Sequence, residues 1–240
     1  MVYKWLISSL SRLGSPSCLL CDAALDDPEN DSGFCPVCHA DLPRFKHACP
    51  RCGNALPFAT TQACGHCLAQ HPAYDRVQAA FAYANPIRQL IARFKFARRL
   101  ELGPMLANAL LERLHENASQ IEAILPVPLH QQRLRRRGYN QAVELARPLA
   151  RALGLPMLLD AVVRHKATLE QSSLTGRQRR SNLKGAFRLE MPLAYRRLAI
   201  VDDVMTTGST VHELATLLKN HGVEYIEVWC AARATTTGSG

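Results

Sequence analysis

The sequence contains no run of about 18 consecutive apolar residues, the minimum length typical of a membrane-spanning helix. We also expect no export signal, because the apolar run from Trp5 to Leu10 is short and is interrupted by two serines. We therefore expect a cytoplasmic protein with no membrane insertion. Cysteines stay reduced in that compartment, so they are available to a metal rather than paired in disulfides.

Acidic residues are scarce in one part of the chain. Between residues 130 and 188 only Glu144, Asp160 and Glu170 oppose thirteen lysines and arginines. The whole chain has 29 Lys+Arg and 20 Asp+Glu, a formal net charge of +9, so the positive excess belongs to this segment. Clustered cations indicate an anionic partner, although a solvated charge run is the simpler alternative.

Cysteine is almost absent outside residues 18–67. The one exception, Cys230, has apolar neighbours that predict a buried core thiol. The other eight form four Cys-x-x-Cys pairs: Cys18/Cys21, Cys35/Cys38, Cys49/Cys52 and Cys64/Cys67. Since each structural zinc site takes four thiolates, they predict two Cys₄ zinc sites, whereas a redox function would need only one pair. Sequential ribbons are favoured, with cross-braced ligation as the alternative.

The residue pattern changes near residue 72, where a cysteine-rich segment gives way to alternating strand and helix signals. We assign residues 1–72 to a double zinc ribbon and 73–240 to a second domain. There, strands are predicted at 77–83, 121–127, 157–163, 186–189, 198–201 and 223–231, and helices at 86–94, 100–115, 140–153 and 209–220. This alternation predicts an α/β domain with a mostly parallel sheet and helices on both faces. The polar stretch 165–184 is expected to be a mobile loop.

The sharpest motif runs from Leu198 to Thr210, a buried strand followed by two acids and a loop of hydroxyl residues. Asp202 and Asp203, at the carboxyl end of the strand, can accept hydrogen bonds from two ribose hydroxyls. The run Thr206 to Thr210 offers hydroxyls, a glycine and the free N–H groups of a helix start, which suit a phosphate monoester. A solvated strand end beside a helix cap explains these residues singly but not the whole string.

This motif resembles the binding signature of type I phosphoribosyltransferases. The whole chain resembles the ComF (competence, GntX-like) family through its cysteine pairs and through 94–96, 126–128, 137–142, 171–172, Arg177 and 182–183. The resemblance implies a type I phosphoribosyltransferase-like domain that binds phosphoribosyl pyrophosphate with Mg²⁺. Asp202 and Asp203 would then be the catalytic acids that hold the sugar 2- and 3-hydroxyls. The substrate-binding residues of the motif would be Val204, Met205, Thr206, Thr207, Gly208, Ser209 and Thr210.

Transfer of the phosphoribosyl group releases pyrophosphate, whose charge must be neutralised by Mg²⁺ and by cationic side chains. The loop 127–130 resembles the pyrophosphate loop of the family. The candidates for this role are Pro128, Leu129, Arg137, Arg164, Lys166 and Arg177. For each cation, a solvated surface charge is the alternative.

Two functions remain open on sequence grounds. One is a phosphoribosyltransferase with an unknown acceptor, linked to DNA uptake or utilisation through the family's association with natural competence. The other is a non-catalytic module that senses phosphoribosyl pyrophosphate and binds single-stranded DNA, with competence-associated DNA-uptake proteins as further partners. The residues predicted to contact nucleic acid are Arg133, Arg135, Arg136 and Arg137.

Overall fold

A computed structural model describes residues 17–25, 33–114, 120–166 and 183–235. The chain forms two compact units, Met1–Leu42 and Pro43–Gly240. The first holds the short helix α2 (Pro36–Ala40), whose N-cap residue is Cys35. The second holds the second set of cysteines together with the α/β part. The assignment of 1–72 to a double zinc ribbon and 73–240 to a phosphoribosyltransferase-like domain remains a proposal.

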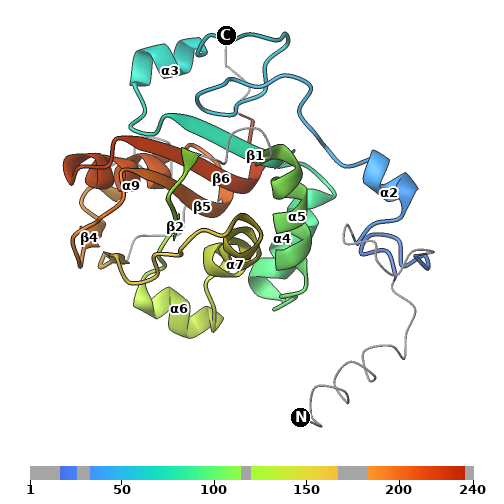
Figure 1. Ribbon diagram of the computed structural model, residues 1–240. Helices are drawn as coiled ribbons and strands as arrows, with labels where there is room; N and C mark the ends of the chain where they lie inside the picture. Colours follow the sequence, from blue (N-terminus) through green and yellow to red (C-terminus); the bar gives the residue numbers. More distant parts are fainter. Residues whose placement is uncertain (1–16, 26–32, 115–119, 167–182, 236–240) are drawn as a thin grey trace. The chain divides into compact units, whose positions relative to one another are not determined.

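The centre of the second unit is a parallel four-stranded sheet with the strand order β1-β6-β5-β2 (Figure 1). Its strands are β1 (Arg76–Ala82), β2 (Ala123–Pro126), β5 (Arg197–Met205) and β6 (Tyr225–Arg233). Long apolar stretches in β5 and β6 are buried, as expected of parallel strands covered on both faces. Cys230, within β6, is fully buried, as predicted.

Helices cover both faces of this sheet, as predicted. Helices α5 (Leu102–Leu114) and α7 (Gln141–Leu153) pack on one face, with α4 (Ile87–Phe96) against α5. Helix α9 (Ser209–Asn220) covers the opposite face, beside the antiparallel strands β3 (Val162–Arg164) and β4 (Phe187–Leu189) (Figure 1). The helix α3 (Gly65–Gln70) belongs to the second group of cysteines.

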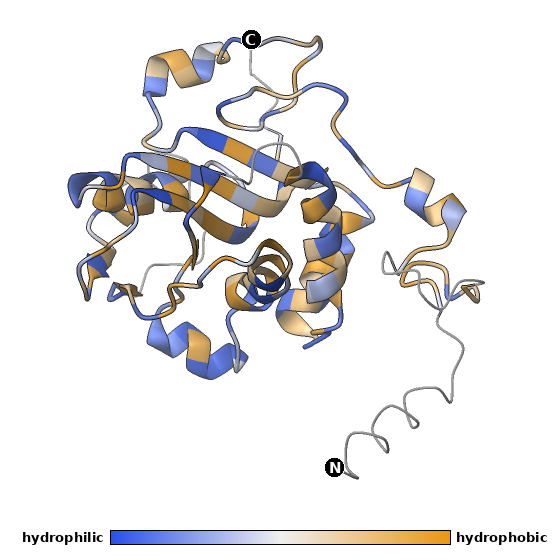
Figure 2. Ribbon diagram, viewed as in Figure 1, coloured by the Kyte–Doolittle hydropathy of each residue, from blue (hydrophilic) through white to orange (hydrophobic). Residues whose placement is uncertain are grey.

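Local signals in the sequence set several of these boundaries. The Asn140 side chain accepts a hydrogen bond from the Ala142 N–H at the start of α7, and Gly154, at a φ of 66°, ends that helix. The charged helix α6 (Gln131–Arg137) begins after His130 and ends at Gly138. It is largely hydrophilic in Figure 2, in contrast to the apolar residues of β5 and β6.

Three expectations about local structure need correction or lie outside the described residues. The strand predicted at 157–163 was wrong in extent, because Met157 makes one bridge to Ile124 and the chain then leaves the sheet before β3. The strand predicted at 198–201 continues to Met205, since β6 pairs with it over that length. Most of the predicted loop at 165–184 falls outside the described ranges.

Candidate functional site

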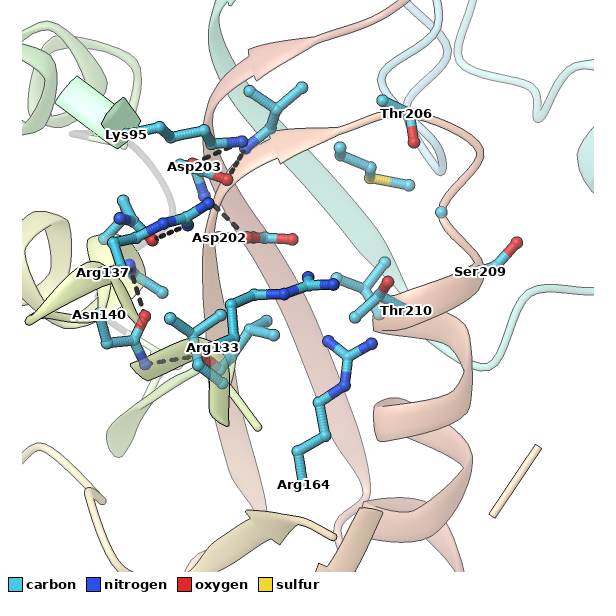
Figure 3. Close-up of a pocket in the computed structure, with 18 residues that line it drawn as sticks. Lys95, Arg133, Arg137, Asn140, Arg164, Asp202, Asp203, Thr206, Ser209 and Thr210 are labelled. Carbon is cyan, nitrogen blue, oxygen red and sulfur yellow. Dashed lines mark hydrogen bonds and ion pairs between the residues drawn. The ribbon is translucent and has the colours of Figure 1, made fainter. Parts of the chain in front are cut away.

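The pocket lies at the carboxyl edge of the sheet, where β5 outruns its neighbour β2. The last pair between these strands is Pro126 with Val201, but β5 continues and pairs Met205 with Arg233 of β6. The side of β5 beyond Val201 is therefore left open. Ligands of open α/β sheets bind in crevices of this kind. The pocket residues are drawn in Figure 3: Lys95, Val127, Leu129, Arg133, Arg137, Asn140, Gln141, Ala142, Arg164, Asp202, Asp203, Val204, Met205, Thr206, Gly208, Ser209, Thr210 and Val211.

The two predicted acids sit differently in this pocket. Asp203 is 6% exposed; its Oδ1 accepts a hydrogen bond from the Val204 N–H, and its Oδ2 lies 2.7 Å from the Lys95 Nζ. Asp202 accepts a hydrogen bond from the Asp203 N–H at 2.9 Å and points into the pocket (Figure 3). Burial, together with the negative charge of Asp203, raises the pKa of Asp202. Asp202 is thus the carboxyl group that faces the pocket, and Asp203 is held by Lys95 and the Val204 N–H.

Lys95 is a site residue that sequence reasoning did not select. It follows the buried Phe94 at the end of α4, and burial opposes its positive charge. The carboxylates of Asp203 and Asp202 outweigh that effect and raise the Lys95 pKa. The sequence signal was a lysine between two phenylalanines at a helix end, which does not reveal its carboxylate partner.

The loop between β5 and α9 contains the glycine, the hydroxyl residues and the helix start that the motif predicts. Gly208 is the N-cap residue of α9 with a φ of 78° and has no side chain to cap the helix, although the Thr207 hydroxyl lies 3.4 Å from the Ser209 N–H and accepts from it. Glycine is favoured here because other residues rarely adopt this φ, and a Cβ would also lie 3.2 Å from the Tyr74 hydroxyl and 2.7 Å from Met205 Cε. Thr206, Ser209 and Thr210 line the same pocket. The start of α9 can therefore present N–H and hydroxyl donors to an anion.

Three arginines complete the pocket opposite this loop. Arg133 and Arg137 lie one helical turn apart on α6, and Arg164 is the last residue of β3. Figure 3 shows the guanidinium groups of Arg133 and Arg164 extending toward each other near Thr210. Burial and the charge of Arg133 lower the pKa of Arg164 to about 10. Two cations held this close in a pocket favour an anionic ligand.

The amides of Asn140 and Gln141 also line the pocket. Asn140 donates from Nδ2 to the Val127 carbonyl at 3.0 Å, which ties the start of α7 to the end of β2. Gln141 accepts a hydrogen bond from Arg137 at 2.5 Å. Its Nε2 is buried and has no hydrogen-bond partner among the described residues. A ligand that accepts this hydrogen bond would satisfy the amide.

Some predicted residues do not line this pocket. Pro128 lines a neighbouring pocket, and Thr207 faces a small one beside Tyr74, where its hydroxyl lies 2.8 Å from that of Ser209. Lys166 is exposed and donates to the Lys184 carbonyl at 2.8 Å. Arg135 and Arg136 are exposed on α6, because helical periodicity turns them away from Arg133 and Arg137. Arg177 lies outside the described residues.

The cysteines form two sequential clusters, one in each compact unit. Cys18, Cys21, Cys35 and Cys38 make the first, and Cys49, Cys52, Cys64 and Cys67 the second. Within each cluster the sulfur atoms all lie within 4.8 Å of one another, a spacing that suits four thiolates on one tetrahedral Zn²⁺. The favoured sequential arrangement is confirmed, and the donor sets fit structural zinc.

The fold and the two cysteine clusters define a phosphoribosyltransferase-type protein with a double zinc ribbon. Residues 139–238 match the phosphoribosyl transferase domain family, and residues 10–68 match the double zinc ribbon domain family. Among the described residues, no helix has both the length and the apolar character needed to cross a membrane.

Curated relatives match most of the chain. Competence protein F of Haemophilus influenzae is 41% identical over 226 residues, which is 90% of this chain and 96% of the relative. The DNA utilization protein YhgH of Escherichia coli K12 is 43% identical over 207 residues, 84% of this chain and 90% of the relative. Competence protein ComFC of Bacillus subtilis is 24% identical over 227 residues, 85% of this chain and 89% of the relative. The chain belongs to the ComF family.

Proposed function

We propose that the pocket binds phosphoribosyl pyrophosphate with Mg²⁺ and that the protein is a phosphoribosyltransferase whose acceptor serves DNA uptake or utilisation. The observation that carries this proposal is the arrangement of three chemically different walls around one pocket. Asp202 offers a carboxylate, the start of α9 offers N–H and hydroxyl donors, and Arg133 with Arg164 offers positive charge. A ribose that bears one phosphate and one pyrophosphate needs all three.

Each wall has a role in this proposal. Asp202 accepts a hydrogen bond from one ribose hydroxyl. Asp203, already bound to Lys95 and the Val204 N–H, holds the neighbouring hydroxyl and stabilises the position of Asp202. The segment from Thr206 to Thr210 holds the 5-phosphate at the helix start. Arg133 and Arg164 flank the pyrophosphate. Leu129 and the rest of the loop 127–130 also contact it.

The chemistry follows from the leaving group. The bond between sugar C1 and the pyrophosphate oxygen breaks, both electrons leave with pyrophosphate, and the acceptor forms a new bond to C1. Positive charge develops on the sugar as negative charge grows on the leaving group, so fixed cations beside the latter stabilise the transition state. Bound Mg²⁺ would supply further neutralisation of the pyrophosphate charge. The protein's own contribution is to orient the sugar between Asp202 and the α9 start.

The test follows binding and turnover separately. The purified zinc-loaded protein is incubated with Mg²⁺ and phosphoribosyl pyrophosphate, with and without single-stranded DNA, while pyrophosphate release is measured and binding is followed by calorimetry. Acceptor-dependent release supports the transferase. Tight binding without release supports the sensing module, and the absence of binding contradicts both. The Asp202→Asn variant serves as the control for binding at this pocket.

A second candidate function is binding of single-stranded DNA beside the pocket. The observation that favours it is a basic surface with an exposed aromatic ring: Phe96 is 72% exposed and the Arg137 guanidinium carbon lies 5.3 Å from its ring centre. Arg135 and Arg136 lie exposed on the same helix as Arg137. Bases of single strands stack on aromatic rings while arginines bind their phosphates. The names of the relatives, which refer to competence and DNA utilisation, agree with this candidate.

A further inference from the structure

Arg233, the last residue of β6, is a charged side chain buried between the second cysteine cluster and the phosphate-binding loop. It is 4% exposed, and among the described residues no carboxylate forms an ion pair with it. Instead its Nε donates to the Cys52 carbonyl at 2.9 Å, and its Nη1 donates to the carbonyls of Met205, at 3.2 Å, and of Thr206. The turn from Cys49 to Gly53, which we call the knuckle, carries two of the cysteines. One guanidinium thus joins the knuckle to the loop that follows β5.

Two more contacts connect the same two regions. The Tyr74 hydroxyl packs against Gly208, and Tyr74 itself is buried in the core that contains Cys49, Cys52 and Cys67. The Ala73 N–H donates to Nδ1 of His212, in the first turn of α9, at 3.1 Å. The knuckle is also packed on the sheet, since a Cβ at Gly53 would lie 2.9 Å from Val77. The second cluster therefore packs on β1 through Gly53, while Tyr74 and Ala73, which follow it in the chain, contact the loop and the start of α9.

A buried arginine without a carboxylate is costly unless its donors are satisfied and a negative charge lies near it. The Cys52 carbonyl satisfies Nε only while the knuckle keeps its position, whereas the carbonyls of Met205, Thr206 and Ala234 accept from Nη1. Four thiolates on one Zn²⁺ carry a net negative charge, which suits a guanidinium bound to the Cys52 backbone. Opening of the knuckle removes the Cys52 carbonyl from Arg233. The guanidinium that binds the Met205 and Thr206 carbonyls is then no longer held in place.

We propose that the second zinc ribbon is a working part of the phosphate-binding site, with Arg233 as the positioning residue that transmits its state to residues 205–212. Zinc at Cys49, Cys52, Cys64 and Cys67 holds the loop in its anion-binding shape. Zinc at the first cluster, in the other compact unit, has no such effect. The proposal rests on the proposed function only for the identity of the anion.

The first experiment needs no ligand and measures backbone hydrogen exchange in the full chain. The Cys67→Ser variant, which removes a ligand of the second cluster, should raise exchange at residues 205–212 at least tenfold. The matched Cys38→Ser variant changes the first cluster and should leave that segment unchanged. Equal exchange in the two variants, or no change in either, would overturn the proposal whatever the pocket binds.

The second experiment uses thermodynamic reciprocity. If the zinc-bound ribbon raises the affinity of the pocket for a ligand, that ligand must in turn raise the affinity of the ribbon for zinc. Zinc release to a chelator is followed with a metal indicator, with and without ribose 5-phosphate at about 100 times its dissociation constant. Release from the second cluster should slow by roughly tenfold to a hundredfold, the upper value applying if the opened state binds no ligand. Release from the first cluster should not change. The Cys38→Ser variant identifies which phase belongs to the second cluster.

The Arg233→Lys variant tests the link itself, since it keeps the charge but loses the forked donors. Ribose 5-phosphate should protect the second cluster less than twofold in this variant, and its affinity should fall about tenfold. Arg197→Lys, on β5 at the opposite end of the sheet, is the matched control and should behave as wild type. Full protection in Arg233→Lys would overturn the role of Arg233. If ribose 5-phosphate fails to bind the wild type, the proposed function fails, while the hydrogen-exchange experiment still decides this inference.

Discussion

The Lys95 ammonium lies 2.7 Å from the Asp203 carboxylate, although Lys95 is in the last turn of α4 and Asp203 is in β5. The pair is largely removed from solvent: the side chains are 23% and 9% exposed. It fixes Asp203 and leaves Asp202 to face the pocket. This ion pair makes α4 a wall of the site.

Replacement of Lys95 by Met should destabilise the protein by about 2 to 3 kcal/mol at neutral pH, because it leaves a buried carboxylate without its cation. Urea unfolding measures the effect. Lys166→Met, which removes an exposed lysine, should change stability by less than about 0.5 kcal/mol. Equal stability of the two variants would contradict the role of the Lys95 pair.

Asp202→Asn should stabilise the protein at pH 8. The raised pKa of Asp202 means that the folded state holds this proton more tightly than the unfolded chain. The resulting stability is fully present below the unfolded value near 4 and is lost as the pH rises through the folded value of about 8. The variant has no such loss, so its melting temperature should exceed that of wild type by a few degrees at pH 8. The difference should diminish toward pH 5, and a constant difference would count against the assignment.

The double change Asp202→Asn with Asp203→Asn should weaken binding of phosphoribosyl pyrophosphate while the fold is kept. At a pH above the Asp202 pKa of about 8, each charge-assisted hydrogen bond contributes roughly 1.5 to 3 kcal/mol, so an affinity loss of at least tenfold is expected by calorimetry. Asp160→Asn, outside the pocket, is the control. Unchanged affinity in the double variant would show that the ligand, if bound, is bound elsewhere.

The chain should contain two zinc ions, since each four-cysteine cluster takes one. Elemental analysis checks the number, and one zinc or none would contradict it.

Cys49→Ser should lower the melting temperature of the α/β part, because Cys49 belongs to the same core as Val77 and Val228. Cys18→Ser should leave that transition in place, as Cys18 lies in the other compact unit.

Changing Arg135, Arg136 and Arg137 together to Ala should weaken single-stranded DNA binding. The slope of log affinity against log salt should become shallower by roughly two to three units, at about 0.7 per lost phosphate contact. Arg137 also lines the pocket, so the double change of Arg135 and Arg136 isolates the exposed surface. Phe96→Ala should reduce affinity with little change in the slope, and Phe58→Ala is its exposed aromatic control. Unaltered affinity and slope in the triple variant would reject a nucleic-acid role for α6.

Local patterns in the sequence determined much of this protein. The Cys-x-x-Cys pairs predicted two Cys₄ sites because two cysteines three residues apart can bind one metal. The helix predicted at 140–153 matches α7, whose ends at Asn140 and Gly154 depend on caps that act on neighbouring backbone groups. The order of strand, acids, loop and helix from Leu198 to Thr210 predicted a phosphate site because its donors lie within one short segment.

Only the tertiary structure decided which distant residues meet. It brought Lys95 to Asp203, placed Arg133 beside Arg164, and separated Arg133 and Arg137 from the exposed Arg135 and Arg136. It also buried Arg233 between Cys52 and Met205. Periodicity and spacing describe one segment at a time, whereas these contacts depend on the order of strands in the sheet and on the packing of helices against it. The sequence therefore determined the kinds of chemistry present, and the fold decided which of them share a site.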